Sequence, residues 1–161
     1  ALIERMLTKR ASSKTIVALD PKPRRRLRHE GIDLLTPNRT EALELAGLDK
    51  EGGGTFPADR VCSLIHERHA PRYLAVTLGA RGMLLSEGGE LGETIPTAAR
   101  EVFDVSGAGD TVISTLTLAL AAGASFREAA VLSNAAAGLV VGKVGTATTE
   151  PEEILAYLEK S

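Results

Sequence analysis

The sequence predicts an α/β layer fold with a largely parallel sheet. Short apolar or β-branched runs, bounded by proline, glycine or an acidic residue, alternate along the chain with segments of helical periodicity. Strands that alternate with helices favour parallel pairing through crossover connections. The length is that of one domain, because 161 residues of which 43% are hydrophobic and 25% charged can bury an ordinary core.

The N-terminal part predicts a helix followed by two strands. Apolar residues within 2–7 have helical spacing, and no strand precedes them, as though the chain enters in the middle of a fold. Residues 15–20 (TIVALD) form a β-branched run that ends in an acid, and residues 32–38 (IDLLTPN) form a second run that ends at a proline. Each indicates a strand. The segment 20–31 between them predicts a charged surface loop, turn or helix.

Two helices are predicted next. Residues 38–47 form a short one, which Asn38 can cap and in whose first turn Glu41 is favourable. A glycine-rich connector follows over 51–57. Residues 58–69 have amphipathic spacing and predict a second helix, which a proline stops.

Three strands and three further helices complete the expected order. Residues 73–97 contain the strands, separated by gaps that contain pairs of glycines. A helix over 107–122 is apolar almost all round and is expected to be buried. An alanine-rich helix over 125–145 can pack closely, and Thr149 and Glu152 predict a capping box for a final helix.

Composition excludes several classes of protein. A net charge of −2, an aromatic content of 3% and the absence of tryptophan argue against nucleic-acid binding and against anionic membranes. The charged start lacks the apolar core of a signal peptide, and no apolar run reaches the length of a membrane span. The single cysteine, Cys62, excludes an internal disulfide and is expected to be buried in a helix. We therefore expect a soluble cytoplasmic protein.

The stretch DVSGAGDTV at 104–112 carries the strongest chemical signal. Gly107 and Gly109 allow close approach of the backbone, and the helix that follows directs unpaired N–H groups at an anion. The dinucleotide-binding fingerprint lacks its third glycine, where Val112 stands, and the G-K-[ST] ending of a P-loop is missing. A plain turn with Asp110 as a helix-terminal carboxylate, favoured by roughly 0.3–1 kcal/mol, stays open as an alternative.

Phosphoryl transfer gives both parts of this stretch a role. The reaction needs stabilisation of a charged phosphoryl group and a base beside the attacking hydroxyl. The backbone N–H groups of Gly107, Ala108 and Gly109 would supply the first, and the carboxylate of Asp110 the second. The aspartate then faces the substrate alcohol and not the ATP.

DVSGAGDTV resembles the C-terminal signature of the ribokinase-like (PfkB-type) carbohydrate kinases, D-[TV]-[TS]-G-A-G-D. Further matches follow in that family's order: DPK at 20–22, NRTE at 38–41, TLGARG at 77–82 and SNAAAG at 133–138. The resemblance implies a three-layer α/β/α fold and an ATP-dependent kinase. Within the family, the residues around 95–114 and 134–148 are most similar to the heptose-7-phosphate kinase domain of bacterial ADP-heptose synthesis. Such a kinase phosphorylates the anomeric hydroxyl of D-glycero-D-manno-heptose 7-phosphate on the route to the lipopolysaccharide core.

The resemblance also implies roles for individual residues. Asp110 matches the catalytic base and 107–109 the anion hole, while Glu41 matches the acid that holds Mg²⁺ through water. Asp104 and Ser106 match positions that bind a monovalent cation such as K⁺ in some members. The expected nucleotide contacts are Lys22, which lies two residues after a strand-end acid and can reach the phosphates, and Asn38, Thr77, Gly79, Gly82 and Asn134.

Each of these residues also has a plainer interpretation. Asn38 and Glu41 can serve only to start a helix, the glycines near Thr77 can be turn residues, and Asn134 can bond across to a neighbouring element. The order and spacing of the whole set favour the kinase.

Two other patterns favour a surface over a site. The basic residues of 22–28 lie in a proline-containing loop of an acidic protein, so solvated charges are favoured over a nucleic-acid patch. His66 and His69 have no third ligand nearby in the sequence and do not form an H-E-x-x-H motif, so a solvated helix face is favoured over a metal site.

The family domain is about twice as long as this chain, and nothing here matches the family's N-terminal sugar site and lid. We therefore expect residues 1–161 to form the C-terminal, ATP-binding half of a kinase domain, whose other half is absent or supplied by a split partner chain, and which forms a homo-oligomer. Two alternatives stay open: a PfkB-type kinase for another sugar or a nucleoside, and an inactive half-domain that binds a nucleotide or a partner.

Overall fold

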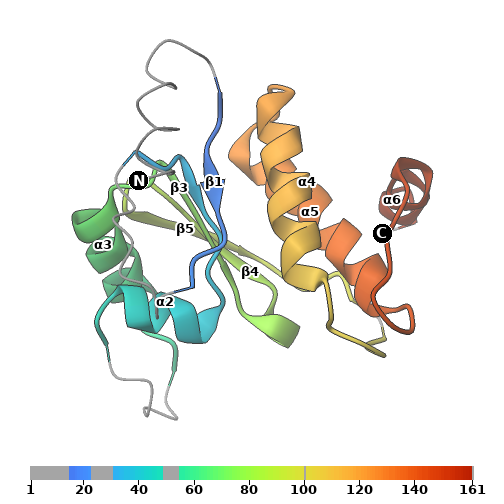
Figure 1. Cartoon of the computed structure of the whole chain (residues 1–161), viewed down its shortest axis with the longest axis horizontal. Coiled ribbons are helices and arrows are strands. Elements are labelled where there is room, and N and C mark those ends of the chain that lie inside the picture. Colours follow the sequence, from blue (N-terminus) through green and yellow to red (C-terminus); the bar gives the residue numbers. More distant parts are fainter. Residues whose placement is uncertain (1–14, 23–30, 49–54, 100, 161) are drawn as a thin grey trace.

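The computed structural model describes residues 15–22, 31–48, 55–99 and 101–160. In these ranges the chain forms a central sheet with helices on both of its faces (Figure 1). The three-layer α/β/α arrangement expected from the sequence is confirmed. The helix expected within 2–7 and most of the basic loop lie outside the described residues.

The sheet has five strands in the order β1-β2-β3-β4-β5. They are β1 (Ala18–Leu19), β2 (Leu34–Leu35), β3 (Tyr73–Thr77), β4 (Met83–Glu87) and β5 (Glu90–Ile95). The pairings of β1 with β2 and of β2 with β3 are parallel, whereas β4 is antiparallel to both of its neighbours. Four of the five strands therefore run in the same direction, and β4 is the reversed one.

The first two strands are shorter than the sequence predicts, because the side chain of Asp33 replaces a backbone carbonyl as the acceptor of a hydrogen bond between them. The Val17 N–H donates to Asp33 Oδ2 at 2.8 Å, and the Asp33 N–H donates to the Val17 carbonyl at 2.8 Å. Beyond β2, Asn38 forms an isolated parallel bridge with Thr77, the last residue of β3. The chain thus stays extended on both sides of the short ladders and carries these residues to the sheet's edge.

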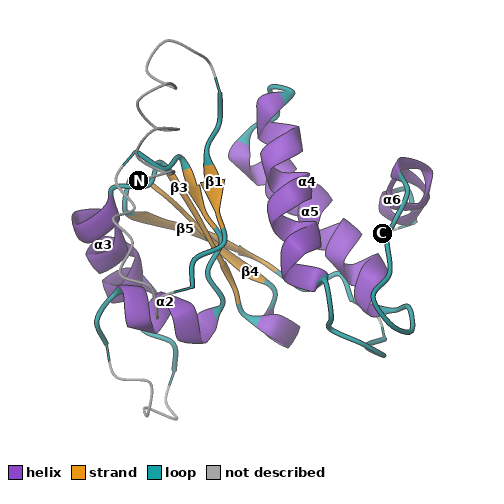
Figure 2. Cartoon of the chain, in the orientation of Figure 1, coloured by secondary structure: helices purple, strands orange, loops and turns teal. Residues whose placement is uncertain are grey.

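Five helices surround the sheet within the described ranges (Figure 2). Two cover one face, α2 (Arg39–Leu45) and α3 (Ala58–His69), and two cover the other, α4 (Ala108–Ala121) and α5 (Phe126–Val141). The last helix, α6 (Pro151–Leu158), packs on α5. A 3₁₀ turn, η1 (Gly79–Arg81), joins β3 to β4. The Ala-rich helix ends at Val141, four residues earlier than expected, and Gly142 is its C-cap.

The strands alternate between two hydrophobic cores, as the period of a strand requires. Leu35 and Leu74 belong to the core beneath α2 and α3, which also buries Cys62. Leu34 and Ala75 belong to the core beneath α4 and α5. The expectation of a buried Cys62 is confirmed, and burial raises the pKa of its thiol.

The helix α4 is not buried all round, which corrects an expectation from its composition. Val112 and Leu116 face the core, at 4% and 0% exposure, whereas Leu118 is 71% exposed. Only the stripe toward the sheet and α5 is covered by the described part of the chain. Apolar composition alone cannot tell which face of a helix has a neighbour.

The cap of α6 lies one residue later than predicted. Pro151 occupies the first turn, a position that suits its fixed φ angle, so Glu150 becomes the N-cap in place of Thr149. Glu153, and not Glu152, completes the capping box, and its Oε2 accepts the Glu150 N–H at 2.9 Å. The Nζ of Lys143 lies 2.9 Å from both oxygens of Glu153, which ties the loop after α5 to α6.

We predict that Glu153 titrates near pH 2. The Glu150 N–H bond, together with Lys143 and Thr149, lowers the pKa of Glu153 from 4.5 to about 2. Because the folded pKa is depressed, the stabilisation is present above pH 4.5 and is lost as the pH falls toward 2. Side-chain carboxyl ¹³C shifts of the folded protein check this, and a midpoint near 4.5 for Glu153 would contradict it. In Glu153→Gln the pH dependence of thermal stability between pH 4.5 and 2 should be smaller.

We predict that Gly82→Ala destabilises the fold strongly, by roughly 2–4 kcal/mol. Gly82 has φ +89°, and an added Cβ would lie 2.0 Å from the carbonyl oxygen of Ile95. The matched control is Gly88→Ala in the β4–β5 turn, where φ is +59° but nothing lies within 4 Å of the added Cβ. That change should cost about 1 kcal/mol. Chemical denaturation measures both, and equal losses would show that the contact with Ile95 is unimportant.

Candidate functional site

A pocket of about 910 Å³ lies at the carboxyl ends of the parallel strands β1, β2 and β3. Ligands of open α/β sheets bind in crevices at this edge. Its walls come from the segment after β1, the start of α2, the β3–β4 turn, the first turn of α4 and one face of α5. Most of the residues singled out from the sequence line it, namely Lys22, Asn38, Glu41, Thr77, Gly79, Gly82, Ala108, Gly109 and Asn134. The loop and helix-start residues Gly107, Asp110, Asp104 and Ser106 are not among the lining residues.

The first turn of α4 opens toward this pocket without a side-chain cap. Gly107 is the N-cap, with φ +82°, a conformation that suits glycine and removes the usual capping side chain. The Ala108 N–H donates to the Val105 carbonyl at 3.2 Å, and the first intrahelical bond runs from the Thr111 N–H to the Gly107 carbonyl at 2.9 Å. The amides of Gly109 and Asp110 lie between these two, where an α-helix provides no acceptor.

Gly109 gives this turn an open face. A Cβ added there would meet no atom within 4 Å, and Gly109 lines the pocket. The next residue, Asp110, is exposed and is the acidic residue of the first helical turn. The geometry thus combines a positive helix end with a carboxylate beside it, the pair of features required of an anion site with an adjacent base.

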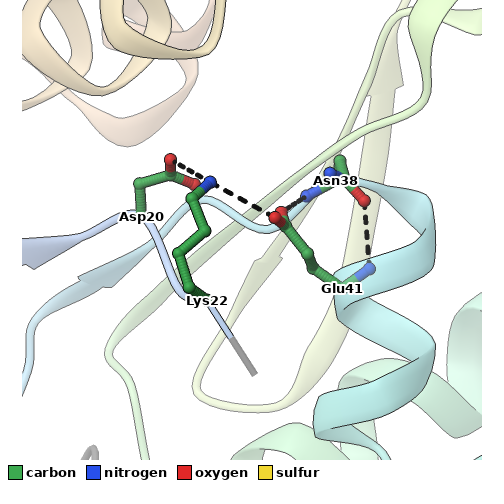
Figure 3. Close-up of polar contacts among 4 residues, drawn as sticks. All are labelled: Asp20, Lys22, Asn38 and Glu41. Carbon is green, nitrogen blue, oxygen red and sulfur yellow. Dashed lines mark hydrogen bonds and ion pairs between the residues drawn. The ribbon is translucent and has the colours of Figure 1, made fainter. Parts of the chain in front are cut away.

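A polar cluster lies on the opposite wall and joins β1 to α2 (Figure 3). The Nζ of Lys22 lies 2.8 Å from Asp20 Oδ2 and 3.3 Å from Glu41 Oε1. The other oxygen of Glu41 accepts the Asn38 N–H at 2.9 Å, and Asn38 Oδ1 accepts the Glu41 N–H at 3.0 Å. Asn38 and Glu41 therefore form a complete capping box for α2, as their plainer interpretation requires. The hydrogen bond to Asp20 is the main cause of the raised pKa of Lys22.

The donor set of this cluster fits Mg²⁺ bound together with a phosphate ligand. Mg²⁺ binds through one or two carboxylates and keeps several waters and substrate oxygens. Glu41 and Asp20 supply hard oxygen ligands, and their side chains are 14% and 26% exposed. Among the described residues no group of three or more His, Cys, Asp and Glu side chains could hold a metal by itself. Asp20 is a further member of this cluster that the motifs alone did not single out, although its place at the end of a strand, two residues before Lys22, is a usable signal.

The α5 wall of the pocket is fixed by contacts to the segment 96–99. The Nδ2 of Asn134 donates to the Pro96 carbonyl at 2.6 Å. Gly138 packs so closely that an added Cβ would lie 2.9 Å from the carbonyl carbon of Ala98. Ala137 and Val141 supply the apolar part of this wall, and Val102, Val105 and Val112 add apolar lining from the loop before α4 and from α4 itself. The wall therefore suits a flat apolar group. The side-chain amide of Asn134 spends one of its two N–H donors on the Pro96 carbonyl.

The loop before α4 is held in place through its backbone. The Phe103 and Asp104 N–H groups both donate to the Val141 carbonyl, at 2.8 and 3.3 Å. Asp104 Oδ1 accepts the Ser106 N–H at 2.8 Å, and this bond lowers the pKa of Asp104. Asp104 and Ser106 thus form a local turn beside the pocket, and their role toward a monovalent cation stays a prediction.

The structure describes both histidines of α3 but only one residue of the basic run. The Nδ1 of His66 lies 3.3 Å from the Pro71 carbonyl, and no metal-binding group includes either histidine of α3. Of the basic run, only Lys22 falls in the described ranges. Within those ranges, none of the helices has the length and apolar character that crossing a bilayer demands.

The fold and the pocket define a class of protein, and sequence comparison agrees with it. Residues 1–153 match the pfkB family carbohydrate kinases, so the chain belongs to this family. It is 43% identical over 141 residues to the bifunctional protein HldE of Desulfatibacillum aliphaticivorans and 42% identical over 154 residues to that of Erwinia tasmaniensis. These matches cover 88% and 96% of this chain but only 28% and 32% of the relatives. The chain thus spans about a third of the length of the curated relatives it matches.

A solved structure shows the same arrangement in a protein with bound ligands. Ribokinase of Arabidopsis thaliana, complexed with ribose and ATP, superimposes with a TM-score of 0.76 at 27% identity. The match covers 91% of this chain and 47% of that one. The ribokinase-like fold is therefore confirmed.

We predict that Asn38→Ala lowers the stability of the protein more than Glu41→Gln does, because the cap needs the Asn38 oxygen but not the charge of Glu41. Asn38→Ala removes the acceptor for the Glu41 N–H and should lower the free energy of unfolding by about 1 kcal/mol. Glu41→Gln keeps an oxygen for the Asn38 N–H but loses the charge that pairs with Lys22, so its stability should change by less than about 0.5 kcal/mol. Thermal and urea unfolding measure both. A larger loss for Glu41→Gln would contradict this division.

Proposed function

We propose that this chain is the ATP-binding and catalytic-base part of a sugar kinase. The observation that carries the proposal is that one pocket is lined both by the uncapped start of α4 and by Lys22 and Glu41, and that Lys22 joins Glu41 to Asp20 just outside the lining. The phosphate chain of a nucleoside triphosphate is bound by backbone N–H groups and a cationic side chain, and carboxylates hold the metal that accompanies it. Family membership supports the same chemistry.

In the proposed reaction the substrate hydroxyl attacks the terminal phosphoryl group of ATP. Asp110 accepts the hydroxyl proton as the new oxygen–phosphorus bond forms, while the bond from the terminal phosphorus to its bridging oxygen breaks and ADP leaves. The backbone N–H groups at 107–109 stabilise the charge on the phosphoryl oxygens, and the Ala108 N–H is shared with the Val105 carbonyl. Mg²⁺, when bound, would neutralise phosphate charge, and Glu41 with Asp20 would hold it through water.

The remaining predicted residues are proposed to position the nucleotide. Lys22 and Asn38 lie on the phosphate side of the pocket, and Thr77, Gly79 and Gly82 form the turn along which the nucleotide would run. Asn134 and the apolar residues of the α5 wall would contact the adenine. A monovalent cation such as K⁺ is proposed to bind near Asp104 and Ser106 and to activate the kinase.

We infer that the substrate is D-glycero-D-manno-heptose 7-phosphate, phosphorylated on its anomeric hydroxyl for ADP-heptose and lipopolysaccharide synthesis in the cytoplasm. The relatives named HldE, at 42–43% identity, support this choice over ribose, fructose or a nucleoside. The residues that present the sugar would lie mainly outside the described pocket walls. The support for this substrate is therefore the sequence similarity of the proposed ATP-binding part to the HldE proteins.

The coverage of the relatives favours a further expectation about the whole protein. The chain aligns with 47% of the Arabidopsis ribokinase, and Leu118 on α4 is 71% exposed. We propose that this face of α4 is covered by the other half of the kinase domain, which supplies the sugar site. A chain that lacks that half would bind nucleotide without turning over sugar. Self-association stays a prediction.

We predict that Asp110→Asn in the kinase that contains both halves lowers kcat by a factor of roughly 10²–10⁴, because it removes the base but leaves the helix start intact. Binding of an ATP analogue should change little. Coupled ADP release with heptose 7-phosphate measures the first quantity and calorimetry the second.

The matched control is Asp59→Asn, since Asp59 is also an acidic residue in the first turn of a helix but lies in α3, away from the pocket. It should leave kcat unchanged. Full activity of Asp110→Asn would remove Asp110 from the role of base.

A further inference from the structure

Lys22 occupies a position between two carboxylates that come from different elements. Its Nζ contacts Asp20 beyond the end of β1 and Glu41 in the first turn of α2, at 2.8 and 3.3 Å (Figure 3). Both oxygens are thus within reach of one cation. The chain itself supplies that cation in the form of an ammonium group.

The three side chains differ in how firmly they are held. Lys22 is 64% exposed, whereas Asp20 and Glu41 are 26% and 14% exposed. Glu41 is also bound through its second oxygen to the Asn38 N–H. The ammonium group can therefore leave the cluster by rotating its exposed stem into solvent or into the pocket, while Glu41 stays in place.

The charges make a second cation at this position unfavourable while Lys22 is there. A free divalent cation gains two carboxylates but meets the ammonium between them, so the ammonium must leave without a new partner. A metal bound to a nucleotide arrives with phosphate oxygens, which offer Lys22 a new partner in the same pocket.

We propose that Lys22 is a positioning residue that holds the place of the metal and exchanges with it. Without nucleotide, its ammonium neutralises Asp20 and Glu41 and disfavours binding of free Mg²⁺. With a metal–nucleotide complex, Lys22 moves to the phosphates and frees the carboxylates for the hydrated metal. This inference rests on the proposed ATP site and adds to it a preference for metal with nucleotide over metal alone.

The plain alternative is a surface ion pair without a function. Exposed pairs contribute about 0–1 kcal/mol and often nothing measurable. The two interpretations predict different changes in metal-binding affinity when Lys22 is replaced. Place-holding predicts that binding of the free metal and of the metal–nucleotide complex change in opposite directions, whereas an inert ion pair changes neither.

The test uses Mn²⁺ as the probe, measured by electron paramagnetic resonance and calorimetry, alone and together with a non-hydrolysable ATP analogue. The variants are Lys22→Met and, in case the apolar side chain perturbs folding, Lys22→Gln. The control is Lys143→Met, because Lys143 also contacts a carboxylate at 2.9 Å, is 36% exposed and does not line the pocket. Circular dichroism checks that each variant is folded.

We expect the Lys22 variants to bind free Mn²⁺ roughly 3–10 times more tightly and the Mn²⁺–nucleotide complex roughly 3–10 times more weakly. Lys143→Met should leave the binding of Mn²⁺ at the pocket unchanged. Unaltered binding of free Mn²⁺ in the Lys22 variants would overturn the inference, whether or not nucleotide binding falls. The same increase in Lys143→Met would overturn it too, since the effect would then be one of net charge. If the unsubstituted protein bound no Mn²⁺–nucleotide complex, the proposed function would fail together with it.

Discussion

The parallel pairing of β1, β2 and β3 is the constraint on which the rest of the structure depends. Parallel strands place their carboxyl ends at one edge of the sheet, and each strand here is followed at that edge by residues that line the pocket. Lys22 follows β1, Asn38 follows β2, and Gly79 follows β3. Residues that are far apart along the chain line the same pocket for this reason.

The two walls of the pocket have opposite electrostatic character. The start of α4 offers a positive helix end without a capping side chain, whereas the β1–α2 wall offers two carboxylates around one ammonium. An anion that carries its own metal complements both walls, because phosphate oxygens suit the first and the cation suits the second. A simple anion or a free metal would complement one wall only. This pairing connects the local chemistry of the site to a metal–nucleotide ligand.

Much of this arrangement could be predicted from the sequence. The alternation of strands and helices predicted the layers, and the boundaries of α3 match those expected from its amphipathic spacing. The resemblance to the PfkB-type kinases predicted which segments gather at the pocket, and the parallel strands explain why their carboxyl ends share an edge. The glycines of 107–109 predicted the uncapped helix start, since a left-handed N-cap needs glycine.

Other features depend on three-dimensional contacts that periodicity does not encode. The bridge from Lys22 to Glu41 depends on the distance between β1 and α2, so Lys22 and Glu41 could not be assigned to one cluster from spacing alone. Asp33 shortens the first ladder through its side chain, and Pro151 moves the start of α6. The exposure of Leu118 depends on what packs against α4 and is therefore invisible in a pattern of apolar residues.

We propose that a nucleotide binds between the start of α4 and the turn after β3. Backbone amide shifts of the ¹⁵N-labelled protein, recorded as Mg²⁺ and a non-hydrolysable ATP analogue are added, test this binding mode. We expect saturable changes on both sides of the pocket, at Gly109 and at Gly79, and none at Leu155 on α6. Saturable changes confined to one wall, or none at all, would contradict it.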